Sequence, residues 1–184
     1  MKTLIKAMLL SLLGAVTLFA QNMDMNGKWK MIRSKSSFLD YYAEMTLDIT
    51  VNKKDAVIIT KMGPKRKYEE KLTFTTDGKA NKNEIIDGTF STNIHMGLRL
   101  PQGGAKEIRA NWEKDGSLKV LQAYDYFASQ GKKRGEMIYR YELSPNKDLL
   151  TCTLERSTRH KGPETKYVFK RFDADNAYLF AMVD

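Results

Sequence analysis

The sequence predicts an all-β protein, a single antiparallel meander that closes into a β-barrel of about eight to ten strands. Two observations predict this fold. Apolar and polar side chains alternate with a period of two from about residue 25 onward, as they do in half-buried strands. Turn-forming pairs such as Asp77-Gly78 and Asp87-Gly88 interrupt the alternation at short intervals. A sequential meander exposes two edges unless it closes, which favours a barrel; because periodicity does not report strand order, a two-sheet sandwich is the alternative.

The clearest strand covers residues 45–51, in which every second residue from Met45 to Val51 is apolar. In residues 67–76, Glu70 falls on the same face as Leu72 and Phe74. We assign residues 130–135 to a loop because they are rich in glycine and charge. The eleven candidate segments for these eight to ten strands, in chain order, are residues 28–33, 45–51, 56–62, 67–76, 84–86, 89–96, 106–113, 118–127, 136–143, 149–157 and 165–172.

The composition is that of one water-soluble globular domain. Of 184 residues, 42% are hydrophobic and 29% are charged, with a formal net charge of +9 at pH 7. The basic runs 65–67 and 132–134 fall in predicted loops, where we interpret them as solvated charge. The single cysteine, Cys152, excludes a disulfide framework, and we expect it to be a small buried hydrophobic side chain.

Residues 1–20 have the pattern of a secretory signal peptide. Lys2 and Lys6 precede an uncharged apolar run that ends at Ala20, and polar residues follow. This run is shorter than the roughly 20 residues that span a membrane. We therefore expect cleavage after Ala20, a mature domain of residues 21–184, and a periplasmic or secreted location. An uncleaved anchor is the alternative.

The residues expected inside the barrel mix methionine and tyrosine with aliphatic side chains. Such a mixture suits a pocket with a few orienting polar groups, and it also suits a packed core. Gln122 shares a face with Val120 and Tyr124, and burial without hydrogen bonds would be costly for its amide. The expected inward set is Met31, Met45, Leu47, Ile49, Ile59, Leu72, Phe74, Ile94, Ile108, Trp112, Val120, Tyr124, Tyr139, Tyr141 and Phe169. Within and beside this set, the candidate ligand-binding residues are Met45, Leu47, Ile49, Leu72, Phe74, Trp112, Gln122, Tyr124, Tyr139 and Tyr141.

Four segments carry a resemblance to a known family. They are Gly27-Lys-Trp29-Lys-Met-Ile, Arg33-Ser-Lys-Ser-Ser-Phe38, Asn146-Lys-Asp-Leu-Leu-Thr-Cys-Thr-Leu-Glu and Tyr167-Val-Phe-Lys-Arg171-Phe. The first resembles the Gly-x-Trp strand of the calycin superfamily, which holds lipocalins and fatty-acid-binding proteins. Together the four are similar to exported bacterial lipocalin-like proteins and bracket nearly the whole mature chain.

The resemblance implies a barrel with an apolar interior that holds a small hydrophobic ligand. It implies that Trp29 closes the barrel floor and that Arg171 stacks over it. It also implies that Phe38, Tyr41 and Tyr42 cross the barrel mouth as a lid, the alternative being loop aromatics anchored on the core. Thr165-Lys166-Tyr167 departs from the Arg-x-Tyr motif with which fatty-acid-binding proteins bind a carboxylate, so a fatty acid is less favoured as the ligand.

Little in the sequence indicates catalysis. The only histidines are His95 and His160, and no His or Cys spacing matches a zinc site, so we expect no metal and no cofactor. The alternation places His95 and Asp125 on the solvent face of their strands. We expect an exported protein that holds a small hydrophobic or amphipathic ligand without catalysis, with no nucleic-acid partner and no membrane-spanning segment. One alternative is an enzyme or haem-type binder that uses His95 or Asp125; another is a filled barrel that acts as a protein-interaction module.

Overall fold

A single antiparallel sheet makes up almost all of the described structure. The computed structural model describes residues 22–37, 43–64, 67–88, 99–157 and 165–172, and ten strands form one sheet in this part of the chain. The 3₁₀ helices η1 (Met23–Met25) and η2 (Arg33–Lys35) flank the first strand. The strands are β1 (Gly27–Met31), β2 (Glu44–Val51), β3 (Asp55–Gly63), β4 (Tyr68–Thr75), β5 (Asn81–Glu84), β6 (Ala105–Trp112), β7 (Leu118–Ala128), β8 (Gly131–Leu143), β9 (Leu149–Arg156) and β10 (Thr165–Arg171).

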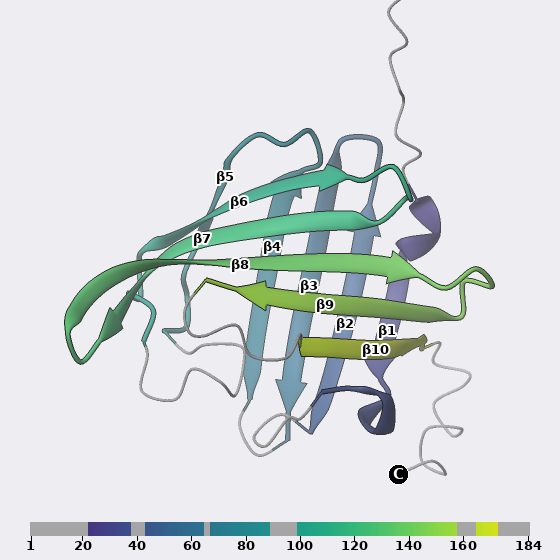
Figure 1. Cartoon of the computed structure of the whole chain (residues 1–184), viewed down its shortest axis with the longest axis horizontal. Helices are drawn as coiled ribbons and strands as arrows, with labels where there is room; N and C mark the ends of the chain where they lie inside the picture. The colour runs from purple at the N-terminus through teal and green to yellow at the C-terminus, as the bar shows by residue number, and fades with distance from the viewer. Residues whose placement is uncertain (1–21, 38–42, 65–66, 89–98, 158–164, 173–184) are drawn as a thin grey trace, which may run out of the picture.

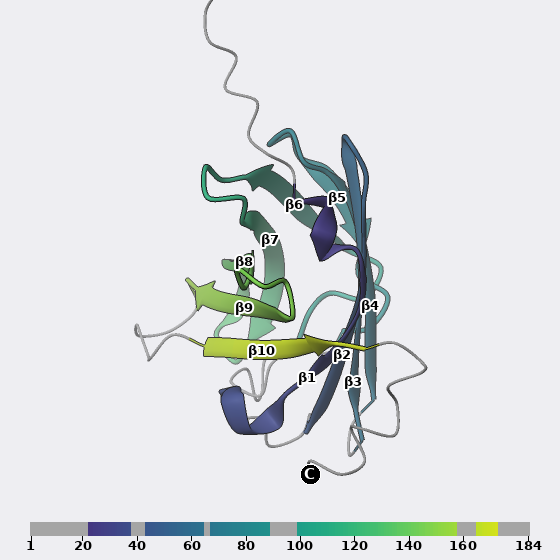
Figure 2. The same ribbon diagram turned by 90° about the vertical axis from the view of Figure 1, so that its right-hand side faces the viewer.

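The ten strands form one continuous sheet because the first strand pairs with the last. β1 lies between β2 and β10, and the order β4-β3-β2-β1-β10-β9-β8-β7-β6-β5 leaves β4 and β5 as the edges. In Figures 1 and 2, β2–β4 and β6–β9 form two curved layers that cross and enclose the core. The all-β meander prediction is confirmed, as one continuous sheet instead of the alternative sandwich. A nearly closed barrel of this kind fits the calycin-like fold that the resemblance implies.

Side chains bridge the two edges where the backbone ladder is missing. The Asn83 amide donates to the Thr73 carbonyl at 2.9 Å, and its oxygen accepts from the Thr73 backbone N–H at 2.7 Å. Asn81 also donates from its amide to the Thr75 hydroxyl at 3.2 Å. The Asn83 side chain thus makes the two hydrogen bonds that a facing backbone would make in a ladder. The edge between β4 and β5 is held by these short polar contacts.

Trp29 and Arg171 come together at one end of the barrel. The Trp29 side chain is fully buried, and its indole N–H donates to the Met25 carbonyl at 3.0 Å. The Arg171 guanidinium lies 4.3 Å from the centre of the Trp29 ring, within the range of a cation–π contact. It also donates to the carbonyls of Asp24 and Asn26, each at 2.7 Å. The Arg171 side chain therefore connects β10 to the Trp29 ring and to the segment around η1.

Gly27 is required by this arrangement. Its φ of +125° belongs to a backbone region that side chains disfavour, and a Cβ built there would lie 2.9 Å from an Arg171 guanidinium nitrogen. The glycine of Gly27-Lys-Trp29 therefore leaves room for the arginine that stacks on the tryptophan.

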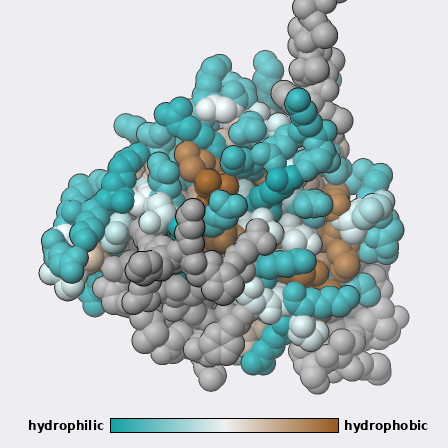
Figure 3. Space-filling view, viewed as in Figure 1, coloured by the Kyte–Doolittle hydropathy of each residue, from teal (hydrophilic) through white to brown (hydrophobic). Residues whose placement is uncertain are grey.

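The outer face of the barrel is polar, as the alternation predicts. In β2, Met45, Leu47 and Ile49 are buried, while the residues between them are partly or fully exposed. Figure 3 shows a mostly hydrophilic face with small apolar areas. Within the described residues, no helix is long and apolar enough to cross a membrane.

The structure corrects one residue of the expected inward set. Ile59 lies half-buried on the outer face, opposite Asp48 and Lys71, whereas Ile58 is 1% exposed and faces inward opposite Ile49. Two adjacent isoleucines make the alternation ambiguous, and pairing with β2 decides which one enters the core. Ile94 of the same set lies outside the described residues.

The predicted start of the ninth strand is also wrong. Residues 130–135 are not a loop, because β8 begins at Gly131 and pairs with Ala128, which leaves Ser129 and Gln130 as the turn. Lys132 and Arg134 lie on the outer face beside Asp125, with nitrogen to carboxylate distances of 2.9 and 3.8 Å. These ion pairs allow the charged residues 132–134 to lie in a strand.

Two other strands differ from prediction by more than one residue at an end. β1 ends at Met31 instead of residue 33, and Ser36 and Ser37 then accept hydrogen bonds from the β10 backbone at 3.0 and 2.7 Å. β5 covers Asn81–Glu84 instead of residues 84–86, because the backbone that pairs with β6 is that of residues 81–84. The predicted strand 89–96 lies outside the described residues.

We expect Arg171→Ala to lower the free energy of unfolding by about 1–3 kcal/mol, because it removes a cation–π contact and two charged hydrogen bonds. Arg171→Lys should recover only part of the loss, since a lysine ammonium keeps the positive charge but lacks the planar guanidinium that stacks on the ring and donates to two carbonyls at once. Urea unfolding followed by tryptophan fluorescence measures this. Lys170→Ala, an exposed neighbour on β10, is the matched control. Equal stabilities of the Arg171→Ala and Lys170→Ala variants would contradict the assignment.

Candidate functional site

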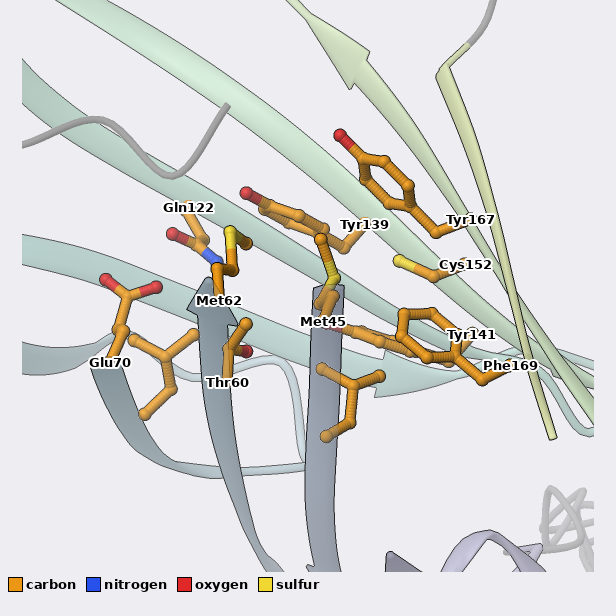
Figure 4. A pocket seen from close by; sticks show the side chains of 12 residues that line it. Met45, Thr60, Met62, Glu70, Gln122, Tyr139, Tyr141, Cys152, Tyr167 and Phe169 are labelled. Carbon is orange, nitrogen blue, oxygen red and sulfur yellow. The ribbon is translucent and has the colours of Figure 1, made fainter. Parts of the chain in front are cut away.

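A small cavity lies inside the barrel between β2–β4 and β7–β10 (Figure 4). Its volume is about 20 Å³, enough for a water molecule but not for a lipid chain. The cavity is bounded by apolar, aromatic and polar side chains together. These are Met45, Leu47, Thr60, Met62, Glu70, Leu72, Gln122, Tyr139, Tyr141, Cys152, Tyr167 and Phe169.

A buried ion pair stands at one side of this cavity. The Lys106 ammonium on β6 bonds to the Glu70 carboxylate on β4, and the two side chains are 3% and 17% exposed. Lys106 lies on the same face of β6 as the fully buried Ile108 and Ala110, so it points into the barrel. A buried charge requires such a partner, because an isolated ammonium in a low-dielectric interior loses its hydration without compensation. The pair therefore links β4 to β6 from inside the barrel.

Gln122 adds a second polar group to the cavity wall. Its side chain extends from β7, where the residue is 2% exposed, and among the described residues its Oε1 atom has no hydrogen-bond partner. A buried acceptor left unpaired costs about 1–3 kcal/mol. Such a group requires an occupant of the cavity, even if only a water molecule.

Tyrosines and a thiol form the remaining polar part of the wall. The Tyr139 and Tyr141 rings lie nearly parallel with centres 6.4 Å apart, and the Tyr139 hydroxyl donates to the Met137 sulfur at 3.6 Å. Burial raises the pKa of the Cys152 thiol to about 12, and it also raises the pKa of Tyr141 and of Tyr167. The thiol and phenols therefore stay neutral at physiological pH, which makes Cys152 a poor nucleophile.

The structure brings together six of the ten candidate ligand-binding residues. The cavity is lined by Met45, Leu47, Leu72, Gln122, Tyr139 and Tyr141. The other four, Ile49, Phe74, Trp112 and Tyr124, are buried in the core away from the cavity. Their burial follows from alternation, whereas access to the cavity depends on how far along each strand a residue lies.

Several cavity residues are missing from the ligand-binding candidates that the sequence predicts. The sequence predicts only burial for Cys152 and no ligand contact for Thr60, Met62, Tyr167 and Phe169, yet all five line the cavity. Lys106, which bonds to Glu70 beside the cavity, is also missing, although it alternates with Ile108 and Ala110. The sequence does indicate Glu70, because this residue lies between Tyr68 and Leu72 on the same face of its strand. A charged residue at an inward position of an alternating strand is the pattern that could have identified both.

Of the residues considered for catalysis, the structure describes only Asp125, which lies away from this cavity. The Asp125 carboxylate lies on the outer face in ion pairs with Lys132 and Arg134. His95, His160 and the possible lid residues Phe38, Tyr41 and Tyr42 lie outside the described residues. In the part of the chain that the structure describes, no group of three or more His, Cys, Asp or Glu side chains is arranged to hold a metal ion.

We expect the barrel to lose stability in alkali through Cys152. From pH 9 the unfolded chain loses the thiol proton, while the folded chain keeps it up to about pH 12, so the free energy of unfolding falls across this window. The tyrosines act in the same direction above pH 10. Urea unfolding at pH 8, 9 and 10 measures the slope, which Cys152→Ala should reduce and Thr153→Ala should leave unchanged. An unaltered slope in Cys152→Ala contradicts the prediction.

Sequence comparisons give no relative for this chain: no protein-family model matches it, and no curated protein matches it. Among solved structures, it is similar to the crystal structure of secretory abundant heat soluble protein 4 from Ramazzottius varieornatus. The two share 12% sequence identity over 84% of this chain and 99% of that chain, with a TM-score of 0.49. This likeness is too distant to carry an argument about ligand or activity.

Proposed function

We propose that this barrel binds a small apolar or amphipathic molecule in its interior, without catalysis. The observation that carries the proposal is the Gln122 side chain, which is buried at the wall of an interior cavity with an unpaired acceptor atom. Protein interiors rarely leave such groups unpaired, and functional sites are a common exception. Apolar walls with a few polar groups are also the usual form of a small-molecule site.

Two methionines offer a way to enlarge the cavity. Met45 and Met62 lie opposite each other on β2 and β3, and both line the cavity. Methionine is unbranched and has three rotatable bonds, so it adopts alternative rotamers more readily than the neighbouring leucines. A ligand longer than a water molecule would enter by displacing these two side chains.

The cavity volume supports a second candidate function. At about 20 Å³ the interior is nearly filled by side chains, which favours a barrel that serves as a structural or protein-interaction module through its outer surface. Binding of an apolar probe separates the two candidates, because a rigid, filled barrel has no room for one.

Export is a further part of the proposal. It rests on the pattern of residues 1–20, where two lysines precede an uncharged apolar run. A ligand-binding barrel outside the cytoplasm would meet small amphipathic molecules directly.

We expect N-phenyl-1-naphthylamine to bind the wild-type protein, with an increase in emission that saturates at about one probe per chain. Met62→Trp should weaken binding by at least tenfold because the indole fills the cavity, whereas Met62→Ala should preserve or strengthen it. Lys61→Trp is the matched control, since Lys61 lies on the outer face of the same strand.

Circular dichroism and thermal unfolding establish that each variant is folded. Absence of saturable binding to both the wild type and Met62→Ala would favour the filled barrel and reject the binding proposal.

A further inference from the structure

We propose that Glu70 and Gln122 form a head-group subsite that selects a ligand ending in a hydrogen-bond donor, either a hydroxyl or a primary ammonium, over one ending in a carboxylate. This inference rests on the proposed binding function and specifies its ligand class. It follows from three features of the cavity wall: which atoms are unpaired, which half of the ion pair faces the cavity, and where the apolar surface lies.

The first feature is the placement of Gln122. On β7 it is opposite Ile108 of β6, and Lys106 lies two residues along β6 on the same inward face. Diagonal neighbours of this kind are about 7–8 Å apart in an antiparallel pair. No hydrogen bond joins the two side chains within the described residues, and the Lys106 ammonium instead bonds to Glu70. Gln122 therefore keeps an acceptor available at the cavity wall.

The second feature is the orientation of the ion pair. Glu70 lines the cavity and Lys106 does not, so the cavity is bounded by the carboxylate half of the pair. The Lys106 side chain is 3% exposed, which leaves its ammonium covered. A carboxylate accepts hydrogen bonds and cannot donate them when ionised. The charge presented to a ligand at this wall is negative.

These two features converge on one chemistry. Figure 4 shows the ends of Glu70 and Gln122 on the side of the cavity away from Cys152 and Phe169. Glu70 accepts through its carboxylate and Gln122 through its unpaired amide oxygen, so a hydroxyl or ammonium placed between them would donate to both. A ligand carboxylate in the same place has no proton to donate to either oxygen, and it would lie nearer to the carboxylate of the ion pair than to its ammonium.

The third feature is the apolar remainder of the wall. Leu47, Leu72 and Phe169 line the cavity, as do the two methionines opposite each other on β2 and β3. These side chains provide a surface for a short alkyl chain attached to the donor group. The site thus combines an acceptor end with an apolar end, which matches a primary alcohol or amine.

The experiment compares three ligands that share one alkyl chain: 1-decanol, decylamine and decanoate. Each is titrated into the wild-type protein at pH 7.5 in competition with N-phenyl-1-naphthylamine, and by isothermal calorimetry. At this pH the amine is protonated and the acid is ionised. We expect decanol and decylamine to bind at least tenfold more tightly than decanoate.

Three variants assign this selectivity to its residues. Gln122→Leu removes the amide at similar volume and should weaken decanol and decylamine about tenfold while leaving decanoate unchanged. Glu70→Gln with Lys106→Met removes both charges together, which avoids an unpaired buried ammonium, and should reduce the preference for decylamine over decanoate. Glu69→Gln is the matched control, because Glu69 pairs with Lys61 on the outer face.

The outcomes separate this inference from the function on which it rests. If neither the naphthylamine probe nor any of the three ligands binds, the proposed function fails and the head-group inference fails with it. If ligands bind but decanoate binds as tightly as decanol, or if Gln122→Leu leaves all three affinities unchanged, the binding function stands and the head-group selectivity is rejected.

Discussion

The pairing of the first strand with the last is the constraint on which the rest of the barrel depends. β1, the first strand in the sequence, hydrogen-bonds to β10, the last. Trp29 and Arg171 lie directly opposite each other in that pair. The arginine then stacks on the indole and bonds to two carbonyls near η1. Because the two residues are far apart in sequence, their contact holds the first strand of the chain against the last. Inward residues of the other strands face a common interior only because the sheet closes here.

Closure is completed differently at the opposite seam. Within the described residues, β4 and β5 have no continuous backbone ladder. The Asn81 and Asn83 side chains bond to β4 outside the core, and the Glu70–Lys106 ion pair joins β4 to β6 inside it. A buried ion pair of this kind contributes little net stability, because desolvation offsets the attraction between the charges. Its stronger effect is on the interior, where it places a carboxylate at a cavity wall that would otherwise be apolar. Glu70 therefore belongs both to the seam of the barrel and to the polar side of the cavity.

The interior combines this polar side with side chains that keep the remaining volume small. Tyrosines bring both bulk and hydroxyl groups, and burial keeps the phenols of Tyr141 and Tyr167 and the Cys152 thiol neutral. Burial therefore leaves this thiol and these phenols without activation for attack on a substrate. Recognition by hydrogen bonding and shape is the activity that we propose for the cavity.

The sequence alone determined the strand content and the polarity of each face, because a period of two is a local property that short windows contain. It also identified Trp29 and Arg171 as partners, through a resemblance. It did not decide between Ile58 and Ile59, the position of β5, or the inclusion of Lys132 in a strand, since each depends on the register of backbone pairing with a neighbouring strand. The cavity is the clearest case. Glu70, Lys106 and Gln122 come from three different strands, and only the closed sheet brings their side chains to one place.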